Sequence, residues 1–245
     1  MATEKVAFIT GGNKGLGFET VRQLGQAGVT VVLGSRDLAK GQAAAKTLQS
    51  EGIQAQALRF DVTEPAGYQE VYDYFDKKYG RLDILINNAG ISREDFMGGN
   101  KTSTTSAEVL QDTFDTNFFG VIHLTQKLLP LIRKSPAGRI VNLSSILGSL
   151  TLHADPSSPI YNAKAFAYDA SKAALNSFTV HLAHELRDTK IKVNSAHPGW
   201  VKTDMGTDAA PMEIPDGAKT SVRLALLPDN GPTGGYFHMN DALPW

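Results

Sequence analysis

Short runs of apolar, largely β-branched residues alternate with longer helix-like segments along the whole sequence. These runs predict strands at 6–10, 29–33, 56–60, 84–86, 139–143 and 191–195. Runs such as VTVVL and RIVNL lack the polar alternation of a half-exposed strand, which indicates strands that are buried on both faces. Because strands of that kind occur in parallel sheets covered by helices, we expect a parallel sheet.

The segments between the strands are rich in Ala, Leu, Gln and Lys, with apolar residues at helical spacing. They predict helices at 16–27, 38–50, 64–79, 107–133 and 166–187. Strands and helices that alternate from end to end are typical of a doubly wound α/β fold with helices on both faces of the sheet. Such a fold binds its ligand beyond the carboxyl ends of the strands, so each strand-to-helix turn is a candidate site.

No repeat and no polar linker divides the 245 residues, so we expect one domain over 1–245. Two stretches, at about 150–165 and 204–217, are long for connections in this fold, and long loops tend to be functional. We therefore expect them to be walls of a substrate site. Their candidate wall residues, with one from the preceding turn, are Leu152, His153, Ile160, Tyr161, Trp200, Met205 and Met212.

Charge and cysteine content exclude several functions. The 24 Lys and Arg residues nearly balance the 25 Asp and Glu residues, so no excess of positive charge attracts nucleic acid or anionic lipid. Without cysteine there is no disulfide framework and no thiolate metal site. The first residues lack a secretion signal, and no apolar stretch is long enough to span a membrane. We expect a cytoplasmic protein with neither nucleic acid nor membrane as a partner.

A glycine-rich turn, TGGNKGLG at 10–17, follows the first predicted strand and opens the first predicted helix. Glycine lets the backbone approach a pyrophosphate, whose negative charge is stabilised by the free N–H groups at a helix N-terminus. The turn lacks the G-K-[ST] ending of a P-loop, which argues against a nucleoside triphosphatase. It therefore predicts a dinucleotide site.

The end of the second predicted strand bears on which dinucleotide binds. Enzymes that use NAD usually place an acidic residue there for the ribose 2′-hydroxyl, whereas this chain has Ser35 and Arg36. A guanidinium pairs well with a 2′-phosphate, and Lys14 offers a second positive charge. These residues favour NADPH over NADH. The alternative is that Asp37, next in the chain, serves NAD or only caps the following helix.

Tyr168 and Lys172 are four residues apart and therefore lie on the same face of a predicted helix. A nearby ammonium stabilises a phenolate and lowers the pKa of the phenol, so such a tyrosine can act as a general acid or base. Ser144 and Ser145 directly follow the predicted strand 139–143, at the edge where this fold places its reactants. An isolated pair of this kind is more often an exposed helix face, so its interpretation depends on the surrounding motifs.

Together the motifs resemble those of the short-chain dehydrogenase/reductase family, in the family's order and over most of the chain. They are the T-G-x-x-x-G-x-G turn, N-N-A-G at 87–90, N-x-x-G at 117–120, Y-x-x-x-K at 168–172 and P-G-x-V-x-T at 198–203. The resemblance implies a Rossmann fold with a seven-stranded parallel sheet, in which 234–237 belongs to the closing strand.

The resemblance also implies roles for individual residues. Ser145 would hydrogen-bond the substrate carbonyl, and the side chain of Asn117 would hold a water on a proton relay to Lys172. Asp61 would contact the adenine ring, although a helix N-cap is an equally good interpretation of that position. The implied catalytic residues are Asn117, Ser145, Tyr168 and Lys172. The implied cofactor-binding residues are Gly11, Asn13, Lys14, Gly15, Leu16, Gly17, Ser35, Arg36, Asp61, Val62, Asn88, Ala89, Gly90, Tyr168, Lys172, Pro198, Gly199, Val201 and Thr203.

One departure from the family pattern is the gap of 23 residues between Ser145 and Tyr168, which is longer than usual. An insertion there is similar to the carbonyl reductase branch, which RDLAKGQ at 36–42 also resembles. The insertion borders a helix that many members use to form dimers, so monomer and homo-oligomer both stay open. No metal is expected, because His181 and His184 lack a third ligand.

The predicted function is therefore NADPH-dependent reduction of a ketone or aldehyde to an alcohol, with a small-molecule carbonyl substrate. Two alternatives remain within the family: an NAD(H)-dependent alcohol dehydrogenase and a 3-oxoacyl reductase. A third, of another class, is a dinucleotide-sensing regulator without turnover. A regulator has no need of both Tyr168 and Ser145, so their presence argues for catalysis.

Overall fold

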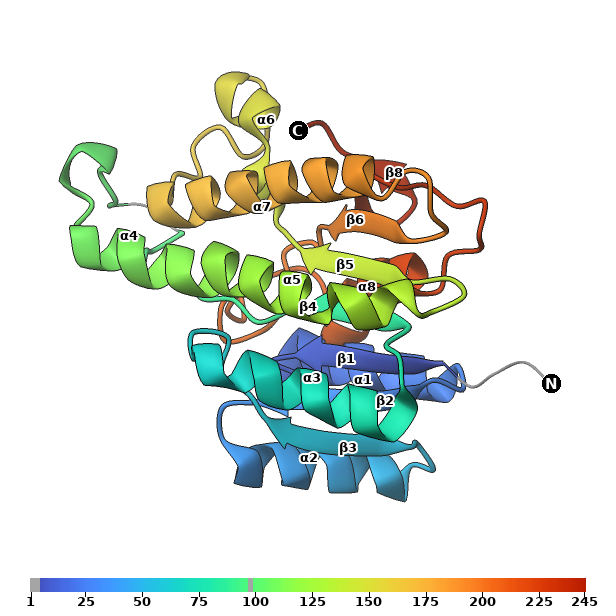
Figure 1. The fold of residues 1–245 in the computed structure, drawn as a ribbon. Coiled ribbons are helices and arrows are strands. Elements are labelled where there is room, and N and C mark those ends of the chain that lie inside the picture. Colours follow the sequence, from blue (N-terminus) through green and yellow to red (C-terminus); the bar gives the residue numbers. More distant parts are fainter. Residues whose placement is uncertain (1–4, 97–98) are drawn as a thin grey trace.

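All the strands found in the computed structural model, which describes residues 5–96 and 99–245, lie in one sheet of order β3-β2-β1-β4-β5-β6-β7-β8 (Figure 1). The strands are β1 (Val6–Thr10), β2 (Thr30–Ser35), β3 (Ala55–Arg59), β4 (Ile84–Asn87), β5 (Arg139–Leu143), β6 (Lys192–Ala196), β7 (Tyr236–His238) and β8 (Asp241–Ala242). β1 to β7 are parallel, as predicted, and the two-residue β8 adds an antiparallel edge. The strand order reverses between β1 and β4, and a ligand site is expected beyond that point.

Helices cover both faces of the sheet. They are α1 (Gly15–Gln26), α2 (Leu38–Ser50), α3 (Pro65–Tyr79), α4 (Ala107–Phe114), α5 (Gly120–Arg133), α6 (Leu150–Ala154), α7 (Phe166–Glu185) and α8 (Ile214–Ala225). In Figure 1, α3, α5 and α7 lie in front of the sheet, whereas α1 and α8 lie behind it. The fold is therefore a three-layered doubly wound α/β sheet, in agreement with the sequence.

The strand β1 explains why the predicted strands show no polar alternation. Phe8 packs into the core on one face, edge-on against Phe60 and Phe75 at ring-centroid distances of 5.5 and 5.6 Å. Its neighbours Ala7 and Ile9 belong to the core on the other face. Neighbouring residues of the strand thus face opposite apolar layers, so the positions from Val6 to Ile9 are all apolar.

The segment 107–133, predicted as one helix, is instead interrupted. A π-helical turn, Asp115–Phe119, separates α4 from α5. At Gly120 the helix lies very close to the turn between β3 and α3. A Cβ at this position would lie 2.2 Å from the Val62 carbonyl oxygen. The wider turn places Asn117 in the interior, where it is fully buried. Single π-turns inside helices often mark functional positions, and this one sets the place of a predicted catalytic residue.

Both predicted substrate loops are shorter than the sequence suggested. The stretch 150–165 begins with the short helix α6, and the stretch 204–217 ends at Glu213, because α8 begins at Ile214. The sequence analysis did not predict α8, because Pro211 and Pro215 are typical of loops. Proline is tolerated in the first turn of a helix, where its missing N–H has no partner to lose.

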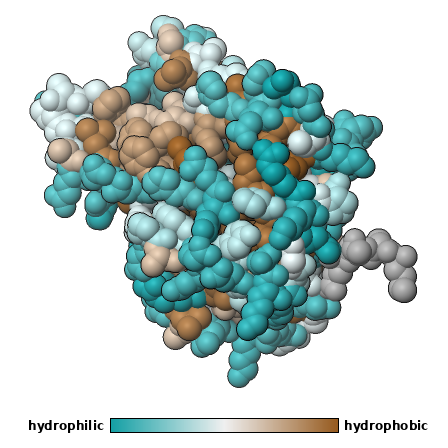
Figure 2. Space-filling model, viewed as in Figure 1, coloured by the Kyte–Doolittle hydropathy of each residue, from teal (hydrophilic) through white to brown (hydrophobic). Residues whose placement is uncertain are grey.

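An apolar area lies over α5 and α7 on the face shown in Figure 2. Phe119, which precedes α5, and Val180 on α7 each keep more than two fifths of their surface exposed. These two helices therefore carry apolar residues on their outer sides as well as on the sides that pack against the sheet.

The central strand should carry a large share of the stability. Leu85 of β4 is fully buried and pairs in register with Phe8 of β1. We expect Leu85→Ala to lower the free energy of unfolding by about 2–5 kcal/mol, because it removes buried apolar atoms and leaves a cavity. Leu150→Ala is the control, since Leu150 is 68% exposed and its loss should change stability by less than about 0.5 kcal/mol. Equal effects in urea unfolding would contradict this view of the core.

Candidate active site

The carboxyl ends of the strands open onto a cavity of about 1210 Å³, where a doubly wound sheet is expected to bind its ligand. Most of the predicted cofactor residues line it. They are Gly11, Asn13, Lys14, Gly15, Leu16, Gly17, Arg36, Asp61, Val62, Asn88, Ala89, Gly90, Tyr168, Lys172, Pro198 and Thr203. Ser35, Gly199 and Val201 do not reach its wall.

The glycine-rich turn forms one end of the cavity. Gly11 and Gly15 have φ angles of +64° and +54°, which favour glycine. At Gly17 a Cβ would lie 2.2 Å from the Gly11 carbonyl oxygen. The residue before α1, Lys14, gives the helix no side-chain cap, and the first turn contains no acidic residue. The free N–H groups of this helix N-terminus therefore fit a pyrophosphate.

Positive charge lies at the mouth of the cavity. Arg36 is exposed and has no ion pair among the residues that the structure describes. Asp37 caps α2 by accepting the Lys40 backbone N–H at 3.1 Å, the alternative role considered for it. Ser35 is buried and donates its hydroxyl to the Asp37 carbonyl at 2.8 Å. Arg36 is thus the residue of this turn that lines the cavity.

Lys40 is a cation that the sequence analysis missed. It lines a second, smaller cavity together with Lys14. The signal in the sequence was its position four residues after Arg36. Lys14 itself forms an ion pair with Asp204, with Nζ and Oδ2 2.5 Å apart.

Asp61 lines the cavity but does not cap a helix. Its Oδ1 accepts the backbone N–H and the hydroxyl of Thr63 at 2.9 and 2.8 Å, whereas the residue at the N-cap of α3 is Glu64. The N-cap interpretation was therefore wrong, because the turn after β3 is longer than the sequence suggested.

The turn after β4 links the two ends of the cavity. The Asn88 side chain donates to the Thr10 and Gly11 carbonyl oxygens at 2.8 and 3.2 Å, which ties the N-N-A-G turn to the glycine-rich turn. At Gly90 a Cβ would lie 3.3 Å from Asn117 Oδ1 and 3.5 Å from Lys172 Nζ. A side chain there would crowd the predicted catalytic residues.

Tyr168 and Lys172 lie side by side on α7, with Nζ 5.5 Å from the centre of the phenol ring. Lys172 Nζ donates to the Leu143 carbonyl oxygen at 2.8 Å, and both side chains are buried. The side chain of Ser145 is near enough to Tyr168 to lower the pKa of its phenol. Ser145 is partly exposed beside the cavity, while its neighbour Ser144 is buried and lines it.

Burial dominates the pKa values of this pair. It raises the pKa of Tyr168 to about 12 and lowers the pKa of Lys172 to about 8. The side chain of Ser145 opposes the rise, and the charge of Asp169 adds to it. The sequence analysis expected a lowered pKa for this phenol, whereas burial raises it. Tyr168 is protonated at neutral pH and can donate a proton.

Asn117 connects the β4 turn to α7. Its Oδ1 accepts the Ile91 N–H at 2.8 Å, and its Nδ2 donates to the Ile91 carbonyl at 2.9 Å and to the Ser171 hydroxyl at 3.0 Å. Both amide hydrogens are used in these contacts, so they position the loop and the helix. The proton relay implied for this side chain stays a prediction.

His197 is a positioning residue that the motif comparison did not single out. Its Nδ1 accepts the N–H groups of Ile146 and Gly199 at 3.1 and 3.4 Å. Burial lowers its pKa to about 3, so the ring is neutral and keeps this acceptor. It thereby joins the segment after Ser145 to the turn that contains Pro198.

Within the part of the chain that the structure describes, neither a metal centre nor a membrane-spanning helix is found. No group of three or more His, Asp or Glu side chains is arranged to bind a metal ion. Nor is any helix there both long and apolar enough to cross a bilayer.

Comparison with known proteins agrees with this geometry. The family described as short chain dehydrogenase matches residues 5–214. The chain belongs to this short-chain dehydrogenase/reductase family. It is therefore an oxidoreductase that acts on carbonyl or alcohol groups with NAD(H) or NADP(H).

The relatives include a carbonyl reductase. "Carbonyl reductase [NADPH] 1" of Sus scrofa is 34% identical, with 98% of this chain and 94% of the relative covered. "Short-chain dehydrogenase/reductase 1" of Saponaria officinalis is 32% identical over 100% of this chain and 97% of the relative. The solved structure of salutaridine reductase from Papaver somniferum has a TM-score of 0.83 and 30% identity, with 96% of this chain and 99% of that chain covered.

The close approach at Gly17 should be needed for cofactor binding. We expect Gly17→Ala to weaken dinucleotide binding by about ten-fold or more, because the added methyl group overlaps the Gly11 carbonyl and must displace the turn. Calorimetric titration with NADPH and with NADH measures the loss. Gly67→Ala is the matched control, since a Cβ there lies at an ordinary 3.4 Å from Phe60. Unchanged binding by Gly17→Ala would refute the site.

Proposed function

We propose that this protein is an NADPH-dependent carbonyl reductase that converts a ketone or aldehyde into an alcohol. The observation that carries the proposal is Tyr168, one helical turn from Lys172, on the wall of the cavity that the glycine-rich turn closes at its other end. This arrangement combines a proton donor with a site for a pyrophosphate.

The residues divide the chemistry among them. When bound, NADPH supplies the hydride that reduces the carbonyl carbon. Tyr168 donates its phenolic proton to the carbonyl oxygen, which becomes the hydroxyl of the product. The Ser145 hydroxyl donates a hydrogen bond to the same oxygen and stabilises the negative charge that develops on it. Lys172 stabilises the phenolate left on Tyr168 until that group regains a proton.

NADPH is favoured because Arg36 faces the cavity without a carboxylate partner among the described residues, and a guanidinium pairs well with a 2′-phosphate. Asp37, the residue that would suit the ribose of NAD, is engaged in capping α2. The name of the relative "Carbonyl reductase [NADPH] 1" also supports this preference.

A bulky, largely apolar carbonyl compound suits the walls best. Of the predicted wall residues, Met205 lines the cavity and keeps more than a third of its surface exposed. Tyr161 and Trp200 are also exposed but do not line the cavity, and the stretch 150–165 contributes nothing to its wall. Ile160, in contrast, is buried and belongs to the packing of the insertion.

We also propose that residues 1–245 act as one domain, because the described strands form one sheet. We propose further that the protein works in the cytoplasm, because it has no cysteine.

Alcohol oxidation with NAD(H) and reduction of a 3-oxoacyl group are the alternatives within the family. "(+)-neomenthol dehydrogenase" of Capsicum annuum, 32% identical, gives the first of these some support by its name. A dinucleotide-sensing regulator is disfavoured, because burying Lys172 and Tyr168 costs free energy that a regulator has no reason to bear.

Replacing the proton donor should separate chemistry from binding. We expect Tyr168→Phe to lower kcat for carbonyl reduction by about a hundred-fold or more, because it removes the phenolic proton while leaving the ring in place. NADPH absorbance measures turnover, and calorimetry should show that NADPH still binds. Tyr72→Phe, on α3 and outside the cavity wall, is the control. If Tyr168→Phe retains full activity, the proposed mechanism is wrong.

The cofactor preference depends on Arg36. We expect Arg36→Ala to raise KM for NADPH by about ten- to a hundred-fold and to change KM for NADH little, because only NADPH carries the 2′-phosphate that the guanidinium would bind. Steady-state rates with each cofactor provide the measurement. Arg187→Ala, an exposed arginine just after the end of α7, is the matched control. Equal losses with both cofactors would argue against NADPH selectivity.

A further inference from the structure

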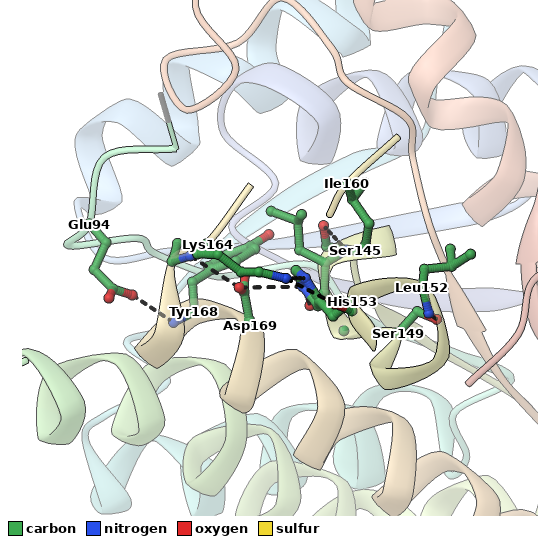
Figure 3. A network of polar contacts seen from close by, with 12 residues as sticks. Glu94, Ser145, Ser149, Leu152, His153, Ile160, Lys164, Tyr168 and Asp169 are labelled. Atoms are coloured by element: carbon green, nitrogen blue, oxygen red, sulfur yellow. Dashed lines mark hydrogen bonds and ion pairs between the residues drawn. The ribbon is translucent and has the colours of Figure 1, made fainter. Parts of the chain in front are cut away.

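A polar network surrounds the first turn of α7, beside Tyr168 (Figure 3). Glu94, in the loop after β4, accepts the backbone N–H of Tyr168 on Oε2 at 3.0 Å. This N–H belongs to the first turn of α7, where amide groups have no partner within the helix, and the N-cap residue Ala165 has no side-chain acceptor. Glu94 therefore caps the helix from a loop 74 positions earlier in the chain.

The same loop also contacts the tyrosine ring. Phe96 lies edge-on against the phenol of Tyr168, with ring centres 5.0 Å apart at 82°. Asn117 holds Ile91, at the start of this loop, through two hydrogen bonds. The loop thus sets the position of both the backbone and the ring of Tyr168.

Asp169 is the second carboxyl group in this network. Its Oδ2 accepts the Ala165 N–H at 3.0 Å. The other oxygens of the two acids, Glu94 Oε1 and Asp169 Oδ1, are buried and have no hydrogen-bond partner among the residues described. A buried carboxylate oxygen without a partner is costly, so the pair favours a state in which Asp169 carries a proton.

The other charged and titratable groups around Asp169 come from the insertion. His153 Nδ1 faces Lys164 Nζ at 3.0 Å, so it accepts, and Nε2 donates to the Leu147 carbonyl at 2.9 Å. Burial and the charge of Lys164 lower the pKa of His153, so its ring is neutral at neutral pH. The Nε2 atom of this neutral ring lies 3.4 Å from Asp169 Oδ2. Burial, and then the charge of Glu94, raise the pKa of Asp169 to about 7, although Lys164 opposes this rise.

We propose that Glu94 and Asp169 are positioning residues for Tyr168: Glu94 fixes its backbone, and the protonation of Asp169 makes proton donation by the phenol depend on pH. The proposal rests on the proposed function of Tyr168 as the proton donor. When Asp169 ionises, its charge raises the pKa of Tyr168. A phenolate formed beside that charge is less stable, so reduction slows as the pH rises through the pKa of Asp169.

The positional half can be measured without turnover. We expect hydrogen exchange at the Tyr168 amide to be about ten-fold faster in Glu94→Ala, because its acceptor is gone, and unchanged in Glu94→Gln, whose amide oxygen can replace it. At a pH low enough that Asp169 is protonated in every variant, kcat for carbonyl reduction should fall about ten-fold in Glu94→Ala and be rescued in Glu94→Gln. Glu70→Ala, on the exposed side of α3, is the control. Unchanged exchange in Glu94→Ala overturns this half.

The pH dependence tests the other half. The wild-type kcat should decline through about pH 7, the pKa of Asp169. Asp169→Asn resembles the protonated acid and should abolish this decline, while Glu94→Gln should move it to lower pH, because it removes a like charge. Asp73→Asn, an exposed residue of α3, is the control and should keep the wild-type profile. A profile of Asp169→Asn that equals the wild type would overturn the role of Asp169.

The results separate this inference from the proposed function. If the wild type reduces carbonyl compounds but neither Glu94 nor Asp169 variants change exchange or pH profile, the inference fails and the function stands. If the wild type reduces none of a broad panel of carbonyl compounds, the function and the pH-dependent half both fail. Hydrogen exchange in Glu94→Ala and Glu94→Gln still decides the positional half.

Discussion

Burial of the sheet on both of its faces is the constraint on which the rest of this structure depends. In β1 the side chain of Phe8 enters one apolar layer and those of Ala7 and Ile9 enter the other. Strands of this kind must run parallel and be joined by helices that cross over a face. All the parallel strands therefore end at one edge, and the cavity lies at that edge.

The proton chemistry proposed at this edge of the sheet depends on the burial of its side chains away from water. Lys172 and Tyr168 are buried, and burial makes each favour its neutral form, with pKa values of about 8 and 12. At neutral pH the phenol of Tyr168 keeps its proton, and Lys172 is still mostly an ammonium, so a proton donor lies beside a positive charge that can stabilise the phenolate it leaves. Ser145 and Glu94 contact the side chain and the backbone of the same tyrosine, from segments that follow β5 and β4.

Local patterns predicted most of this fold. The limits of β1, β5 and α2 were predicted to the residue, because apolar runs or helical spacing end there at glycine, serine or charged residues. Motif spacing predicted four catalytic residues, which stay a prediction, and the structure brings three of them, Ser145, Tyr168 and Lys172, together. What the sequence could not show depends on contacts between distant segments. The π-turn before Gly120 reflects the nearby Val62 carbonyl, and the role of Glu94 needs α7 beside the β4 loop.

The central claim is that Tyr168 delivers the proton that accompanies hydride transfer. The solvent deuterium isotope effect on a single turnover of enzyme-bound NADPH with a ketone tests it most directly, because only transferred protons that exchange with solvent are replaced. The account predicts slower turnover in deuterated water for the wild type and no such slowing of the residual rate in Tyr168→Phe. An isotope effect of equal size in both proteins would contradict it, since the proton would then come from another donor.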